Sequence, residues 1–207
     1  MTKPLLLAAT LLLASCATSN DAPPAVSGKI ATTPADRFYE NVAALCGRSF
    51  AGRIIANTPA SSTPDPFAGK ALVMHVRECS DSELRIPFHV GDDRSRTWVL
   101  SRQANGLRLK HDHRHADGSP DATTLYGGDT DAAGSEGRQE FPVDAESQAM
   151  FRAQGMQASL TNVWAMEIRP ASELIYELSR PGGRLFRVSF DLTQPVPTPA
   201  APWGAAE

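Results

Sequence analysis

Apolar residues recur at every second position in a series of short runs along most of the chain. A period of two places the apolar side chains on one face of an extended strand and the intervening side chains on the other. Turn-forming residues separate the runs, so the pattern predicts an all-β chain of about eight to ten short strands. The clearest runs are residues 71–76, 84–90, 97–101, 163–168, 174–178 and 186–192.

The spacing of these runs favours a small antiparallel β-barrel. Asn105 and Gly106 signal a two-residue hairpin between two runs, because a type I′ turn needs positive φ at both central positions. The runs follow one another as an even series of hairpins, without a long connection that would have to cross between two sheets. Residues 123–139 are the one stretch that could contain such a connection, which leaves a β-sandwich as the alternative.

One short helix is predicted before the first strand. Thr33 can cap it, Pro34 suits its first turn, and the carboxylate of Asp36 favours the positive end of the helix. Gly47 supplies a stop, which gives the helix a length of about 12 residues. Three apolar residues at helical spacing form the face that we expect to pack on the main body: Phe38, Val42 and Leu45.

The segment that leads from this helix into the first strand, residues 45–52, contains a Gly, an aromatic residue and a second Gly. These are Gly47, Phe50 and Gly52. The segment resembles the start of the calycins, the group of lipocalins, fatty-acid-binding proteins and nitrobindin-like barrels. Phe50 stands where those families usually have Trp. The resemblance implies a small up-and-down barrel and, by itself, no particular ligand.

The beginning of the chain is typical of a bacterial lipoprotein signal. Lys3 precedes an apolar run over residues 5–13, which is too short to span a bilayer of about 30 Å as a permanent helix. The residues directly before Cys16 are Leu13, Ala14 and Ser15. We expect residues 1–15 to be removed as a signal peptide and Cys16 to be acylated, which would make the lipid bilayer a partner. An ordinary signal peptide that happens to be cut near Cys16 is the alternative.

The rest of the chain divides into a tether, one domain and a tail. Ala17 occupies the position where an inner-membrane retention signal would place Asp, so we expect a cell-envelope protein on the periplasmic face of the outer membrane. Residues 16–33 are rich in Ala, Ser, Thr and Pro and predict a disordered tether. Residues 34–193 have the size of a single barrel domain. Residues 194–207 are Pro-rich and predict a disordered or draped tail with Trp203 as its anchor.

The charge balance argues against nucleic acid as a partner. The chain has 20 Lys and Arg against 23 Asp and Glu, for a net charge of −3 at pH 7. A protein that binds nucleic acid needs a basic face to neutralise phosphates, and no cluster of basic residues predicts one here.

Two cysteines remain after the lipidation site, Cys46 and Cys79. Export would place them in an oxidising compartment, where an even number of cysteines favours a disulfide. The sequence therefore predicts a Cys46–Cys79 bond, with two unpaired buried thiols as the alternative. Such a bond would restrain the loop of Pro-containing sequence between the two residues.

The densest polar cluster of the sequence contains three of its five histidines: His111, His113 and His115. On a strand, residues at alternate positions share one face, so the three imidazoles are expected to point the same way. Imidazole is a common ligand of zinc and copper, and His75 or His89 from a neighbouring strand could complete a metal site. Contact with a bound molecule and simple hydrogen bonding to loops at the rim are the alternatives. No metal or cofactor is assigned from the sequence.

The same region carries a second resemblance. Three segments carry it: residues 85–91, 94–100 and 111–118, the last of which reads HDHRHADG. With them the chain resembles, over about residues 35–196, a family of uncharacterised exported bacterial proteins that includes lipoproteins. The resemblance implies no activity, because none is established for that family.

Our leading hypothesis from the sequence is a lipid-anchored binding protein whose barrel holds a small molecule or an envelope component. The residues that we expect to contact it are His111, His113 and His115, with Asp112, Asp117, His89 and Trp98. The alternative is a hydrolytic enzyme, metal-assisted or acid–base, that uses the three histidines with Asp112 or Asp117. A surface that serves only protein contacts is a third interpretation.

Overall fold

The computed structural model describes residues 32–60 and 65–205, together with Met1. In this part of the chain there are two α-helices, one 3-10 helix and 11 strands. None of the helices within these ranges is long and apolar enough to cross a bilayer. The predicted lipidation site Cys16, and most of the predicted signal peptide and tether, lie outside the described residues.

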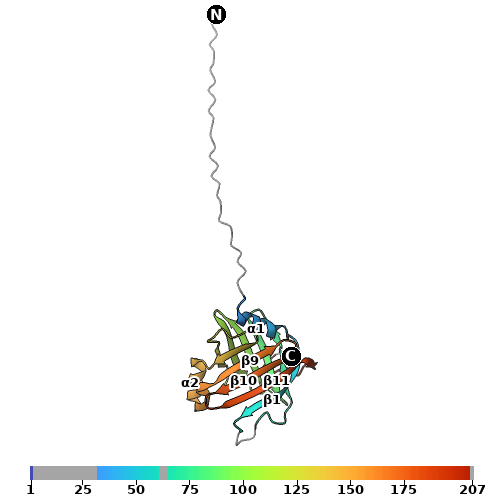
Figure 1. Ribbon diagram of the computed structural model, residues 1–207, viewed down its shortest axis with the longest axis vertical. Coiled ribbons are helices and arrows are strands. Elements are labelled where there is room, and N and C mark those ends of the chain that lie inside the picture. Colours follow the sequence, from blue (N-terminus) through green and yellow to red (C-terminus); the bar gives the residue numbers. More distant parts are fainter. Residues whose placement is uncertain (2–31, 61–64, 206–207) are drawn as a thin grey trace. The chain divides into compact units, whose positions relative to one another are not determined.

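The strands form a nearly closed antiparallel barrel (Figure 1). Ten of them make up its wall: β1 Ser49–Thr58, β2 Leu72–His75, β4 Glu83–Val90, β5 Asp93–Gln103, β6 Gly106–His113, β7 Tyr126–Asp129, β8 Arg138–Pro142, β9 Val163–Arg169, β10 Glu173–Arg180 and β11 Arg184–Val196. Their order around the wall is β7-β6-β5-β4-β2-β1-β11-β10-β9-β8. The two-residue strand β3, Glu78–Cys79, pairs with β4 alongside this path.

Neighbouring strands in the wall are also successive in the chain, except where β1 pairs with β11 and joins the two ends of the domain. This is an up-and-down barrel, so the predicted barrel is confirmed over the alternative sandwich. Residues 123–139 hold β7 and the start of β8, which lie next to each other rather than in two sheets. The architecture agrees with the calycin-like expectation at the level of the fold.

A second α-helix, α2 (Ala145–Ala153), packs at the seam of the barrel, where the first and last strands of the wall, β7 and β8, meet. The Ser147 hydroxyl of this helix accepts a hydrogen bond from the Gly127 N–H at 2.8 Å and donates one to the Gly127 carbonyl at 3.2 Å. The Asp144 N–H donates to the same carbonyl at 2.9 Å. At Gly128 a Cβ atom would come within 1.7 Å of the Pro142 carbonyl oxygen, so the close approach of the two strands requires glycine.

The sequence pattern gave no sign of α2, because the helix buries only Ser147 and Phe151. A helix that packs through so small a face lacks the apolar stripe on which sequence-based prediction depends. The 3-10 helix η1 (Gln157–Thr161) continues from α2 toward β9.

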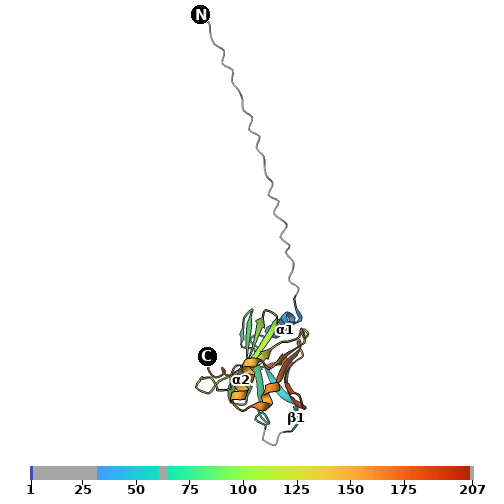
Figure 2. The ribbon, with the colours of Figure 1, turned by 90° about the vertical axis from the view of Figure 1, so that its left-hand side faces the viewer.

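The first helix, α1 (Pro34–Ala43), closes one end of the barrel (Figure 2). Its ten residues begin at a capping box, in which Thr33 and Asp36 bond each other's backbone N–H groups. Phe38 and Val42 are fully buried against the strands. The Asn41 side chain donates to the Glu136 carbonyl at 3.1 Å and thereby ties the helix to the loop before β8. The predicted start and buried face of the helix are confirmed.

A disulfide joins Cys46, in the turn after α1, to Cys79 in β3. The pairing predicted from the sequence is therefore confirmed. The bond links the helix that closes the barrel to the β3–β4 hairpin at the same end, which the Tyr39 hydroxyl also contacts through the Ser80 carbonyl at 2.9 Å.

The C-terminal residues lie against the outside of the barrel. β11 continues to Val196, three residues beyond the domain boundary predicted at residue 193. Farther along, the Trp203 N–H donates to the Arg94 carbonyl at 3.1 Å, and the Arg94 guanidinium donates to the Ala201 carbonyl at 2.9 Å. Prolines remove some N–H donors from this segment, so the barrel wall holds it through the remaining N–H of Trp203 and through the carbonyl of Ala201.

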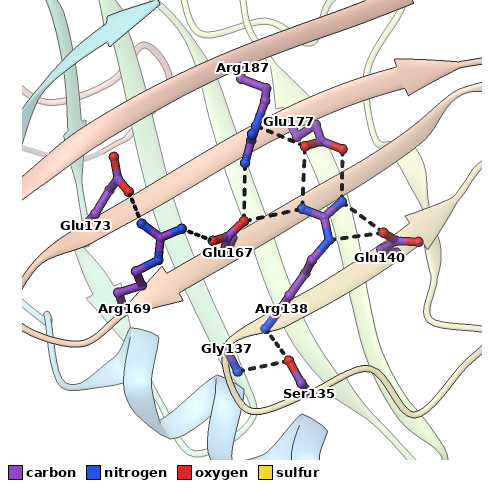
Figure 3. Close-up of polar contacts among 9 residues, drawn as sticks. All are labelled: Ser135, Gly137, Arg138, Glu140, Glu167, Arg169, Glu173, Glu177 and Arg187. Atoms are coloured by element: carbon purple, nitrogen blue, oxygen red, sulfur yellow. Dashed lines mark hydrogen bonds and ion pairs between the residues drawn. The ribbon is translucent and has the colours of Figure 1, made fainter. Parts of the chain in front are cut away.

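The outer wall of β8–β11 carries a network of ion pairs (Figure 3). Arg138 lies 2.9 Å from carboxylate oxygens of both Glu140 and Glu177. Glu167 bonds Arg169 at 2.8 Å and Arg187 at 3.2 Å. Each arginine of this network has at least two carboxylate partners within 4.0 Å, so the charges on this face are neutralised locally.

Candidate functional site

The inward-facing side chains change in character from one end of the barrel to the other. Near α1 they are mostly aliphatic and fully buried, and include Leu84, Ile86, Leu100, Leu107, Leu109, Met166, Ile168 and Leu174. Toward the opposite end the same strands present aromatic rings, then histidine and arginine. On β5 the order is Leu100, Trp98, Arg96, and on β6 it is Leu109, His111, His113. The closed end is therefore a packed core and the other end is a lined cavity.

The cavity has a volume of about 380 Å³. This lies within the range of about 300–1,000 Å³ that is usual for small-molecule sites. Its apolar lining comes from seven strands or loops and includes Phe67, Phe88, Trp98, Tyr126, Trp164, Tyr176 and Phe186. The ring of Phe67, in the loop between β1 and β2, packs against this lining, with its centroid 5.1 Å from that of Phe186 and 5.9 Å from that of Phe88.

The rings of the cavity wall pack on one another. Trp98 stacks on Tyr176 with ring centroids 4.4 Å apart, and it also stacks on Phe88 with ring centroids 4.8 Å apart. Stacked rings have few alternative rotamers once packed, so they form a rigid apolar surface. A ligand that enters the cavity therefore meets a wall whose shape exists before binding.

His111 is the most buried titratable group of the cavity wall. Its Nδ1 lies 3.1 Å from the Tyr126 carbonyl oxygen, which can only accept, so Nδ1 carries the proton. The Nε2 atom then accepts a hydrogen bond from the Tyr176 hydroxyl at 2.8 Å. Burial, with a smaller contribution from His113, lowers the pKa of His111 to about 3. The ring is neutral at physiological pH and both of its nitrogens are engaged by protein groups.

His113 lies one step closer to the opening. Its Nε2 is 3.1 Å from the Tyr126 hydroxyl. Burial, reinforced by the nearby charge of Arg96, lowers the pKa of His113 to about 4, while burial raises the pKa of Tyr126 to about 12. Both groups are therefore neutral near pH 7, and they present a hydrogen-bonding edge without charge.

Three of the residues predicted from the sequence line the cavity: His111, His113 and Trp98. His115 does not, because β6 ends at His113 and the chain turns outward; the His115 side chain is 55% exposed, with Nε2 3.9 Å from Asp121. The expected sharing of one strand face by all three histidines thus holds for two of them. Asp117 is exposed as well and caps a turn through the Ser119 N–H at 2.9 Å.

Asp112 and His89 lie on the outer wall. Each directly follows a residue that faces the cavity, Asp112 after His111 on β6 and His89 after Phe88 on β4. The buried Asp112 carboxylate bonds Arg85 at 2.6 Å and Arg114 at 2.9 Å, and these hydrogen bonds keep its pKa below the ordinary value despite burial. His89 is 4% exposed, and burial, followed by the charge of His75, lowers its pKa to about 4. In the described part of the chain, no group of three or more His, Cys, Asp or Glu residues could hold a metal ion.

Sequence reasoning missed most of the lining residues. Trp164, Tyr176 and Phe186 belonged to predicted strands, but their runs gave no sign of which stretch faced a cavity. The arginines at the opening, Arg96, Arg180 and Arg184, were also missed. The signal was present on β5, β10 and β11, whose inward-facing series each end in an arginine at the opening, but it is visible only when the three strands are compared.

Comparisons with protein-family models, curated proteins and solved structures give no match to this chain. The resemblance to exported lipoproteins drawn from residues 85–118 is therefore not supported by a family match, and the calycin-like resemblance is supported only as a fold. Functional interpretation rests on the geometry of the cavity.

Proposed function

We propose that this protein binds a small, largely apolar molecule in the open half of its barrel. The observation that carries the proposal is the unequal filling of the two halves: aliphatic side chains fill the end under α1, whereas aromatic rings line about 380 Å³ at the other end. A barrel that needed only a stable core would have no reason to leave that volume unfilled, because unfilled volume costs stability.

The chemistry of the lining favours binding over catalysis. Both nitrogens of His111 are occupied by Tyr126 and Tyr176, and the pKa values of His111 and His113 are lowered to about 3 and about 4. A general base works best with a pKa near the operating pH, so both imidazoles are weak bases near pH 7. The enzyme alternative also relied on Asp112, Asp117 and His115, which lie outside the cavity. The geometry gives that alternative no specific support.

Titration with N-phenyl-1-naphthylamine, an uncharged aromatic probe, tests the proposal. Its emission should rise on binding, and energy transfer from Trp98 and Trp164 to the probe should persist in Trp203→Phe, which removes the one tryptophan outside the cavity. Leu178→Trp should weaken binding, because Leu178 lines the cavity and a larger ring there narrows it.

A matched control lies at the next position. Ser179→Trp adds the same ring at the neighbouring residue, which alternation directs away from the cavity, and it should leave probe binding intact. Failure of the wild-type protein to bind the probe, or equal loss in the two variants, would contradict the proposal.

Independently of the cavity, we propose that the protein is tethered at the cell envelope through an acylated Cys16. The support is the lipoprotein-like sequence that precedes Cys16. Cys16→Ser should release the mature protein from the membrane fraction, whereas Ser19→Ala should not. Ala17→Asp should shift the protein from the outer to the inner membrane. Unchanged membrane association of Cys16→Ser would exclude the lipid anchor and would leave the cavity proposal untouched.

A further inference from the structure

The opening of the cavity is cationic, although the chain as a whole has a net charge of −3. Arg96, Arg180 and Arg184 line it, against a single lining carboxylate, Asp121. They stand at the ends of three inward-facing series on β5, β10 and β11. Since β5 lies across the barrel from β10 and β11, the charges approach the opening from two sides.

Among the described residues, no carboxylate neutralises two of these arginines. Arg96 pairs with Asp93, whereas neither Arg180 nor Arg184 has a carboxylate within 4.0 Å among residues 32–60 and 65–205. Arg180 donates through Nε to the Asn162 side chain, and its two terminal nitrogens form no hydrogen bond with a described residue. Arg184 donates through Nη1 to the Asn57 side chain and to the Thr58 carbonyl.

The arginines on the outer wall of β8–β11 differ from these two in their partners. Arg138, Arg169 and Arg187 on β8, β9 and β11 are each matched by glutamates (Figure 3). Near the opening, by contrast, the half-buried Arg180 and Arg184 on β10 and β11 have no such partner among the described residues. Burial, followed by the charge of Arg184, lowers the pKa of Arg180, which indicates that the two cations act on each other. Placing like charges together at the edge of an apolar cavity is unfavourable unless an anion joins them.

We infer that the ligand is an anionic amphiphile: its carboxylate or phosphate group binds Arg180 and Arg184 at the opening, and its apolar body lies among the aromatic rings below. The guanidinium group presents a planar fork of N–H donors that matches both kinds of anion. The order of residues along the strands, cationic at the opening and aromatic beneath, fixes the direction in which such a molecule would enter. This inference rests on the proposed function, because it specifies the ligand of the same cavity.

Two probes that share one ring system and differ in charge test the inference separately from the proposed function. 8-Anilinonaphthalene-1-sulfonate has the ring system of N-phenyl-1-naphthylamine with a sulfonate added. We expect the wild-type protein to bind the sulfonated probe at least about tenfold more tightly, which is the size of one charge-assisted hydrogen bond. Equal affinities would overturn the inference, whereas binding of neither probe would contradict the proposed function.

Substitution of the two arginines tests whether they cause the preference for the sulfonated probe. Arg180→Gln or Arg184→Gln should lower the affinity for the sulfonated probe about tenfold and change the affinity for the neutral probe less than twofold. Arg184→Lys, which keeps the charge, should retain most of the preference. Arg169→Gln, on the outer wall, is the matched control and should change neither affinity. Equal weakening of both probes in the cavity variants, with unfolding curves like those of the parent, would overturn the inference.

Competition then identifies the anionic group. Dodecanoate and dodecyl phosphate share an alkyl chain and differ in the head, so displacement of the sulfonated probe by either one supports the inference and their ranking names the preferred group. Dodecanol has the same chain without a charge. Displacement by dodecanol as effective as displacement by both anions would overturn it.

Discussion

The closed and open halves of the barrel are built from the same strands, and they differ in what the inward side chains do. On β10, Leu174 is 1% exposed in the core, while Leu178, four residues later on the same face, borders the cavity. On β6, Leu109 is fully buried in the core and His111 belongs to the cavity wall. One periodic pattern therefore supports two roles, with stability concentrated under α1 and binding at the opposite end.

The largest expected effect tests this division with one substitution at two positions. Leu174→Ala should lower the free energy of unfolding by about 3 kcal/mol, because it leaves a void in a packed core. Leu178→Ala should cost about 1 kcal/mol, since its side chain already borders unfilled space and fewer contacts are lost. Urea denaturation gives both values, provided that the dependence of the free energy of unfolding on urea concentration is the same in the variants and the parent. Equal losses would show that the open half is packed as tightly as the closed half.

The disulfide gives the next prediction, because it strengthens only the closed end. Replacing Cys46 and Cys79 together by Ser should lower the free energy of unfolding by about 3 kcal/mol, within the usual range for such bonds. At temperatures where the variant remains folded, binding of N-phenyl-1-naphthylamine should match that of the parent. Two thiols that react with a maleimide in the native, unreduced protein would show that the bond is absent in solution.

Much of the fold was predictable because the barrel depends on local signals. The alternation on β4, β9 and β11 and the capping box at Thr33 each act within a few residues of sequence. The predicted hairpin between β5 and β6 is present, but its two turn residues are Ala104 and Asn105 rather than Asn105 and Gly106, and Asn105 lacks the positive φ of a type I′ turn. Helix α2 was not predicted because it is held at the seam by a contact between Ser147 and Gly127, a glycine 20 residues away in the sequence. No short-range pattern encodes such a contact.

The site was predictable only in part, and His115 shows why. Strand periodicity correctly directed His111 and His113 inward, but it could not say where β6 stops. Arg180 and Arg184 flank a turn in the sequence and carry no local signal of a site. Their significance comes from the absence of nearby carboxylates among the described residues and from strands across the barrel. The direction in which a side chain points is a local property of its strand, whereas a cavity depends on side chains from the whole circumference of the barrel.

A smaller effect is expected from pH and belongs to the open half. The pKa of His111 is about 3 in the folded protein against an ordinary 6.5, so as pH falls below 6.5 the unfolded chain takes up a proton that the folded protein does not. Stability is therefore lost from about pH 6.5 downward, by about 2 kcal/mol from this residue between pH 7 and pH 5.

The variant His111→Gln isolates this contribution. An amide can still donate to the Tyr126 carbonyl and accept from the Tyr176 hydroxyl, but it does not titrate. Its stability should fall less than that of the parent between the two pH values, while His115→Gln, at an exposed ring, should follow the parent. Parallel losses in the parent and in His111→Gln would mean that this histidine is protonated in the folded state.

The smallest predicted effect tests whether the two halves are independent. Thr33 caps α1 by accepting a hydrogen bond from the Asp36 N–H at 3.1 Å, while the Asp36 carboxylate accepts from the Thr33 N–H at 3.0 Å. Thr33→Ala should cost about 1 kcal/mol, the usual value for a helix cap. The substitution loosens the helix that closes one end but leaves the cavity lining as it is. Probe affinity should therefore stay within twofold of the parent, and Thr32→Ala, beside the cap, should change neither quantity. Weaker binding in Thr33→Ala would show that strain at the closed end reaches the opening, and the division between a stabilising half and a binding half would have to be given up.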